Sequence, residues 1–299
     1  MLAILNHPVA LRIALIVLIA LAVLAAGGLG YVRYELRPRS ARVDPPAGLP
    51  VQSAVIPSRS GSRLAGWYLP GEGRGAVLLL HGAKSNRLVV VDRMRMLREA
   101  GYDSFAIDFQ AHGESPGDMI SMGRLESLDA RSALDWLREK QPEEPIAALG
   151  ISMGGAAILL GESIKADAVI LESVFPDLAA GYTRRVDAAL GPLGPPAARL
   201  LLLALQIWGA DADKLRPIDG IRRLHVPILL MSGAADQRVT ADEARALFAA
   251  ANPPKEYWEV PGAGHIDLAY SGGEAYRSRL LGFLDSTLRE RSFSGERPP

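Results

Sequence analysis

The stretch PIAALGISMGGAAILL, residues 145–160, decides the fold that we expect for this chain. Its first part is a short apolar run typical of a buried strand, and its last part favours a helix. Between them lies Gly150-Ile151-Ser152-Met153-Gly154, which places a serine on a sharp turn from strand to helix. The glycines let strand and helix approach closely. We therefore expect the Ser152 hydroxyl to stand clear of the sheet, with the Met153 amide aimed at any oxyanion formed beside it.

Apolar runs of similar length recur along the chain on either side of this turn. Segments with helical spacing separate them, and this alternation predicts a mostly parallel central sheet with helices on both faces. Two earlier runs, Val51–Ile56 and Leu64–Leu69, flank a turn rich in serine and predict an antiparallel hairpin. The remaining strands are expected at residues 76–80, 104–107, 146–149, 168–171, 227–231 and 257–260.

An uncharged apolar segment, residues 13–32, precedes the part of the chain that we expect to fold as a domain. It is long enough to cross a bilayer, which predicts a single-pass membrane protein anchored by residues 1–34. A cleaved signal peptide is the alternative, but its apolar region is usually shorter and Ala25-Ala26-Gly27-Gly28 is a poor cleavage site. More basic residues follow the segment than precede it, which slightly favours a cytoplasmic domain, although long domains can be translocated despite their charges.

The rest of the chain divides by composition. We expect a proline-containing linker at residues 35–50, one α/β domain at residues 51–290 and a flexible tail at residues 291–299. Within the domain, residues 175–219 are too long for a simple connection and predict a short helical cap over the carboxyl ends of the strands. The apolar part of this cap, Leu200–Trp208, either forms an acyl-binding wall or packs onto the sheet.

The overall composition excludes several classes of function. The chain has 33 basic and 33 acidic residues and a pI near 7.0, which argues against a nucleic-acid partner. It has no cysteine, so disulfides, thiol nucleophiles and zinc sites built on thiolates are excluded. Composition does not indicate an oligomeric state.

A serine nucleophile requires a base and a group that orients this base. Asp236 and His265 each follow an expected strand, so both are expected at the sheet edge that carries Ser152. His265 is the one histidine that follows both other residues at a strand end. Glu172 is the rival acid, and Asp236 has the alternative role of capping the helix that follows it.

An oxyanion site needs a second backbone donor beside the Met153 amide. The loop after the strand at residues 76–80 begins with His81-Gly82, where the glycine allows the Ala83 amide to turn toward the serine. Lys84 follows in the same loop and is expected to be solvated rather than to contact substrate.

With these motifs the chain, from about Val51 to Leu288, resembles the serine α/β-hydrolase superfamily, and it is similar to small esterase- or lipase-like members with an N-terminal membrane anchor. This resemblance rests on the order Ser152, Asp236, His265. It also rests on the segment Asp108–Ser115, which follows the strand expected at residues 104–107. It implies an α/β-hydrolase fold and hydrolysis of carboxylic esters or thioesters without cofactor or metal.

The substrate implied by the resemblance is a small molecule or lipid with an acyl group. Two alternatives stay open: a serine peptidase or amidase of the same fold, and a catalytically silent protein that binds lipid or protein. Because a linker would separate the anchor from the site, we also expect a chain without Met1 to Val43 to be soluble and active.

Overall fold

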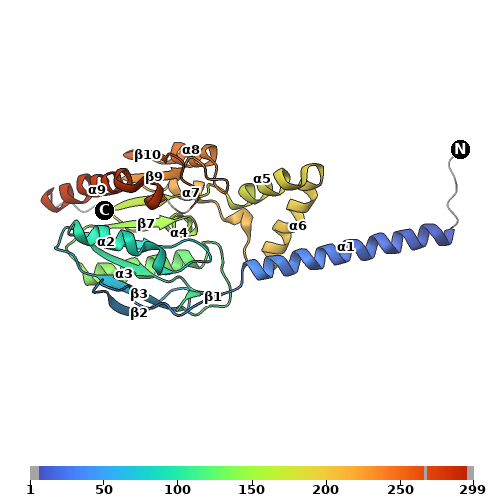
Figure 1. The fold of residues 1–299 in the computed structure, drawn as a ribbon, viewed down its shortest axis with the longest axis horizontal. Helices are drawn as coiled ribbons and strands as arrows, with labels where there is room; N and C mark the ends of the chain where they lie inside the picture. Colours follow the sequence, from blue (N-terminus) through green and yellow to red (C-terminus); the bar gives the residue numbers. More distant parts are fainter. Residues whose placement is uncertain (1–6, 266–267, 295–299) are drawn as a thin grey trace.

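The structure is a computed structural model that describes residues 7–265 and 268–294 (Figure 1). Its strands are β2 (Gln52–Pro57), β3 (Arg63–Leu69), β4 (Ala76–Leu80), β5 (Asp103–Ile107), β7 (Ile146–Ile151), β8 (Ala168–Glu172), β9 (Ile228–Gly233) and β10 (Lys255–Val260). They form an eight-stranded sheet in the order β10-β9-β8-β7-β4-β5-β3-β2. Strand β3 is antiparallel to both of its neighbours, and every other pair is parallel. The predicted hairpin and the mostly parallel sheet are confirmed.

Helices cover both faces of the sheet because each central strand is apolar on both sides. Along β4, Leu78 and Leu80 belong to one buried cluster, while Val77 and Leu79 belong to the other. The first cluster packs against α3 (Glu126–Lys140), α4 (Met153–Leu159) and α8 (Ala241–Ala250), and the second packs against α2 (Val91–Glu99) and α9 (Leu268–Ser294). Helix α9 reaches Ser294, four residues into the expected tail, and residues 295–299 lie outside the described residues.

The expected cap region contains a pair of helices between β8 and β9. These are α5 (Leu178–Leu190) and α6 (Gly194–Ile207), joined by the turn η2 (Gly191–Leu193) and followed by η3 (Ala212–Lys214) and α7 (Pro217–Ile221). The chain reverses at Gly191, which has a φ of 55°, so that α5 and α6 pack against one another. Gly191 therefore ends one helix and begins a hairpin.

By length and composition one helical stretch of the described residues, Leu178–Ile207, is apolar enough to cross a membrane. The structure does not describe several side chains of α1 (His7–Glu35), so the finding on membrane-crossing helices does not cover α1. The hairpin makes the stretch two helices of 13 and 14 residues. Each is shorter than the roughly 20 residues that a bilayer requires.

Helix α1 projects away from the domain, and its last turns pack against the domain through Leu29 and Val32 (Figure 1). The segment that follows differs from the expected linker, because it lies along the domain. Strand β1 (Arg39–Ser40) pairs in parallel with β6 (His112–Gly113). In the segment after α1, the apolar side chains of Leu36, Val43 and Leu49 are buried. A few apolar residues among the prolines therefore hold this segment against the domain.

Candidate active site

Ser152 lies on the turn between β7 and α4 in a strained backbone conformation. Its φ of 51° and ψ of −112° lie in a region that residues with a side chain rarely adopt. A methyl group on Gly150 would lie 2.4 Å from the amide nitrogen of Gly155. One on Gly154 would lie 2.4 Å from the carbonyl oxygen of Leu80. Both glycines are therefore required for the close approach of strand and helix that presents the serine.

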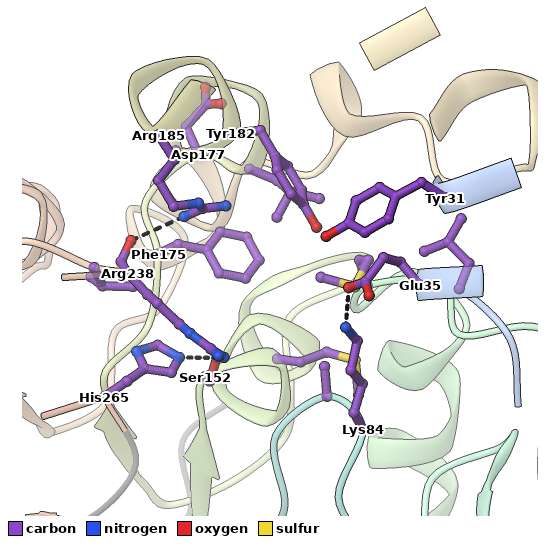
Figure 2. Close-up of a pocket in the computed structure, with 17 residues that line it drawn as sticks. Tyr31, Glu35, Lys84, Ser152, Phe175, Asp177, Tyr182, Arg185, Arg238 and His265 are labelled. Atoms are coloured by element: carbon purple, nitrogen blue, oxygen red, sulfur yellow. Dashed lines mark hydrogen bonds and ion pairs between the residues drawn. The ribbon is translucent and has the colours of Figure 1, made fainter. Parts of the chain in front are cut away.

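Three side chains from loops after different strands form a chain of hydrogen bonds. Ser152 Oγ lies 2.9 Å from His265 Nε2 (Figure 2). His265 Nδ1 lies 2.8 Å from Asp236 Oδ2. A carboxylate can only accept, so Nδ1 carries the proton and Nε2 accepts from the serine hydroxyl. The imidazole is therefore held in the tautomer that can take a proton from Ser152.

The environment of Asp236 favours its ionised form. Burial raises the pKa of this carboxyl, but the hydrogen bond from His265 and the backbone amides of Val239 and Arg238 outweigh it and lower the pKa. The two amides donate to the other carboxylate oxygen at 3.0 and 2.8 Å. Asp236 is thus fixed on one side and free to hold the imidazole on the other.

The rival acid, Glu172, has other partners. Its carboxylate accepts hydrogen bonds from the Tyr276 hydroxyl at 2.6 Å and from the Arg93 guanidinium at 3.1 and 2.5 Å. All three side chains are buried below the serine turn. Glu172 therefore takes part in a structural ion pair rather than in the hydrogen-bond chain of Ser152.

The two expected oxyanion donors lie on the same pocket as the serine. Met153 begins α4 and Ala83 lies in the loop after β4, and both line the pocket beside Ser152. A methyl group on Gly82 would lie 3.6 Å from Ser152 Cβ, so this loop runs directly past the serine. The structure brings both residues to the pocket of Ser152, and the binding of an oxyanion by their amides stays a prediction.

Two buried histidines hold this loop from behind. His81 accepts from the Phe109 amide at 3.1 Å, and His112 accepts from the Lys84 amide at 3.1 Å. Burial lowers the pKa of both rings, and their proximity lowers that of His81 further. Both are therefore neutral and act as fixed acceptors rather than as bases. The segment Asp108–Ser115, which carries His112, supports the loop and does not line the pocket.

The pocket in front of Ser152 has a volume of about 440 Å³. Helix α5 and the last turn of α1 form the wall opposite the hydrogen-bond chain (Figure 2). Its lining residues are Tyr31, Glu35, Leu36, Ala83, Lys84, Met122, Ser152, Met153, Phe175, Asp177, Leu178, Gly181, Tyr182, Arg185, Arg238, Val239 and His265. The segment Leu200–Trp208 is not among them, so of its two expected roles the acyl-binding wall is wrong.

Several lining residues were not predicted from the sequence. Arg238 stands two residues after Asp236, and this proximity is the one sequence signal available for it. Tyr31, Glu35 and Arg185 come from segments whose positions depend on how α1 and α5 pack. Lys84, expected to be solvated, forms an ion pair with Glu35 at the pocket wall. The described residues contain no group of three or more acidic or histidine side chains placed to hold a metal ion.

Comparison with known proteins connects this geometry to a family. Residues 71–197 match the family model described as serine aminopeptidase, S33. An uncharacterized protein of Mycobacterium tuberculosis, Rv2307c, is 32% identical over 249 residues, which cover 81% of each chain. The α/β-hydrolase domain-containing protein WAV2 of Arabidopsis thaliana is 28% identical over 253 residues, which cover 79% of each chain.

The fold is also similar to those of solved structures. The esterase Pf2001 of Pyrococcus furiosus superposes with a TM-score of 0.69 at 22% identity, over 85% of this chain and all of that chain. An esterase from Exiguobacterium antarcticum gives a TM-score of 0.59 at 19% identity, over 78% of this chain and 99% of that chain. At these identities the likeness establishes the fold.

Proposed function

Because this chain belongs to the α/β-hydrolase superfamily, we propose that it is a serine hydrolase that cleaves carboxylic esters or thioesters through an acyl-enzyme on Ser152. One observation carries the proposal: the continuous hydrogen-bond chain from Ser152 through His265 to the ionised Asp236. A silent binding protein of this fold has no need of a correctly oriented imidazole beside a strained serine.

The reaction follows from the placement of these groups. His265 Nε2 takes the hydroxyl proton as Ser152 Oγ attacks the acyl carbonyl, and the amides of Met153 and Ala83 bind the resulting oxyanion. The tetrahedral intermediate collapses when His265 gives its proton to the departing alcohol or thiol. Water then attacks the acyl-enzyme by the same steps in reverse, which releases the acid and restores Ser152. Asp236 holds the imidazole throughout.

The charges of the pocket favour ester hydrolysis over aminopeptidase activity. An aminopeptidase must bind a cationic amino terminus, which requires a free carboxylate near the serine. The acidic lining residues Glu35 and Asp177 are already paired, with Lys84 and Arg216. The remaining charged lining residues are arginines.

A fluorophosphonate probe tests the proposal, because it labels only activated serines. We expect the full chain in detergent to be labelled and to hydrolyse short p-nitrophenyl esters, and Ser152→Ala to do neither. Labelling without ester or thioester hydrolysis, together with cleavage of aminoacyl p-nitroanilides, would favour the peptidase. An unlabelled wild-type chain would favour the silent binding protein.

We also propose that α1 anchors the protein in a membrane. The helix has 29 residues and is therefore about 43 Å long, and its apolar side chains Leu11, Ile16 and Leu18 are exposed. The cap hairpin lies beside it, where Trp208 Nε1 donates to the Leu29 carbonyl at 3.1 Å. The outer side chains of α6 and the preceding turn are also apolar and exposed: Leu193, Leu200, Leu203 and Ile207.

Extraction and mass measurement test the anchor. We expect the intact chain to stay with membranes in alkaline carbonate, whereas a mature chain starting near Gly28 in the soluble fraction would indicate a signal peptide. Protease added to intact spheroplasts tests the cytoplasmic orientation, because a cytoplasmic domain is digested only after lysis. Digestion before lysis would place Ser152 on the outer side.

A further inference from the structure

Three arginines meet at one corner of the pocket, and only one of them has a carboxylate partner among the described residues. Arg184 binds Glu243 through two hydrogen bonds of 3.2 and 3.1 Å. Arg185 and Arg238 line the pocket and form no ion pair within the described part of the chain. Of these two neighbours on α5, Arg184 therefore has a carboxylate within ion-pair distance and Arg185 does not.

A hydrogen bond joins Arg185 to the backbone of Arg238, and the Arg238 side chain lies beside the serine (Figure 2). Arg185 Nη1 donates to the Arg238 carbonyl at 3.1 Å, and its guanidinium lies 4.7 Å from the centre of the Tyr182 ring. The Arg238 amide binds Asp236, and the Arg238 side chain extends toward Ser152 and His265 (Figure 2). Burial lowers the pKa of Arg185, so this position disfavours an uncompensated cation.

The rest of the pocket does not supply the missing negative charge. Glu35 pairs with Lys84 on the opposite side of the pocket (Figure 2). Asp177 accepts from the Ala180 amide at 2.9 Å with one oxygen and pairs with Arg216 through the other. The acidic residues of the pocket wall are thus each paired with another cation, Glu35 with Lys84 and Asp177 with Arg216, and neither forms an ion pair with Arg185 or Arg238.

We propose that Arg185 and Arg238 bind an anionic group of the substrate, a phosphate or a carboxylate, beside the acyl group that Ser152 attacks. Arginine is suited to this role because its planar guanidinium donates two parallel hydrogen bonds to such groups. The apolar lining residues Leu36, Met122 and Phe175 remain for the acyl chain. The inference rests on the proposed hydrolase function and narrows its substrates to anionic esters.

Matched pairs of esters test this inference. One pair is a 1-monoacylglycerol and the 1-acylglycerol 3-phosphate with the same short acyl chain; the other is methyl hexanoate and monomethyl adipate. Each pair keeps the ester bond, and only one of its members carries an anionic group. The two pairs separate phosphate from carboxylate recognition. We expect the wild type to have a higher kcat/KM for the anionic member of at least one pair, with an advantage that shrinks as salt rises.

Arg185→Gln and Arg238→Gln should each lower kcat/KM for that anionic ester by about 10- to 100-fold more than for its neutral partner, the loss expected for a charge-assisted hydrogen bond. Arg184→Gln is the matched control. Arg184 also donates to the Arg238 carbonyl, at 2.9 Å, but its own charge is already paired. It should therefore affect both members of a pair equally.

Binding to Ser152→Ala keeps the inference testable apart from turnover. Calorimetry should detect the 1-acylglycerol phosphate or the adipate monoester, and should lose it when Arg238→Gln is added. No Ser152-dependent hydrolysis of any ester, with this binding intact, would refute the proposed function and leave the anion site standing. Equal binding with and without Arg238→Gln, or equal losses for neutral and anionic esters, would overturn the anion site.

Discussion

The two sides of the pocket are built in different ways. Ser152, Asp236 and His265 lie on short loops after β7, β9 and β10, so the buried sheet fixes their separation. The opposite wall comes from α1 and α5, two helices outside the sheet that both pack against α6. The first side therefore supplies the proposed chemistry, and the second adds surface that the substrate contacts. Mutations on the two sides should then differ in kind.

The largest effect should come from the serine itself. Ser152→Ala should reduce ester hydrolysis by roughly 10⁴- to 10⁶-fold, and His265→Ala nearly as much, because the nucleophile and its base act as one unit. Initial rates with p-nitrophenyl acetate measure this loss, with thermal unfolding as the control for folding. A loss of only a few-fold would remove Ser152 from the proposed chemistry and with it the distinction between the two walls.

The acid should come second, and a comparison of two carboxylates sharpens the result. Asp236→Asn should lower kcat by about 10⁴-fold, because the amide favours the wrong imidazole tautomer. Glu172→Gln should keep the activity per folded molecule but lower stability by about 3 kcal/mol, because buried Arg93 loses its counter-charge. The reverse pattern would make Glu172 the acid. Urea unfolding and kcat of both variants decide between them.

The wall contributed by α1 should have a smaller effect on rate. A chain without Met1 to Val43, which the sequence predicts to be soluble and active, lacks Tyr31, Glu35 and Leu36 of the pocket wall. Its kcat/KM should fall about tenfold or more, since the substrate loses a positioning surface, while the probe still labels Ser152. A chain without Met1 to Gly27 keeps this wall and is the matched control. Equal activity of the two truncated chains would contradict the proposed role of α1.

The buried histidines behind the oxyanion loop predict a pH dependence of stability. The pKa values of His81 and His112 in the folded state lie below the ordinary value of 6.5. The unfolded chain therefore binds more protons as the pH falls below about 6.5, and stability is lost in that direction. The urea midpoint should drop between pH 7 and pH 5. In His112→Asn, which keeps an acceptor but does not titrate, the drop should be smaller; an identical drop would exclude His112 as its source.

The smallest effect should be that of chelators. The proposed chemistry uses side chains and backbone amides on both sides of the pocket, so EDTA should leave kcat unchanged. Hydrolysis of p-nitrophenyl acetate before and after dialysis measures this. Loss of activity that a divalent ion restores would refute a cofactor-free mechanism.

The sequence predicts one side of the pocket far better than the other. Ser152, Asp236 and His265 can be placed because each follows an apolar run, and parallel strands bring their carboxyl ends to one edge. The structure brings these three side chains into hydrogen-bonding contact. Arg185 and Tyr31 could not be placed, since they lie on helices whose positions depend on contacts with segments distant in sequence.

Dependence on tertiary contacts also explains why the segment after α1 was expected to be a linker. Its prolines and charges are typical of a linker, and they conceal that Leu36, Val43 and Leu49 are spaced to bury against the domain. The pairing of β1 with β6 is too short to leave a pattern of alternation. Local composition therefore predicted a linker, whereas tertiary packing holds this segment against the domain.

The pairing of Arg39–Ser40 with His112–Gly113 has a consequence for how far the protein reaches. A domain on a flexible tether samples every height above the membrane that its tether allows. With α1 as the proposed anchor, two backbone strands and a buried helix end hold this domain at one height and one tilt. The pocket then stays within a thin layer parallel to the bilayer. A substrate must bring its ester bond into that layer, whatever the substrate concentration elsewhere.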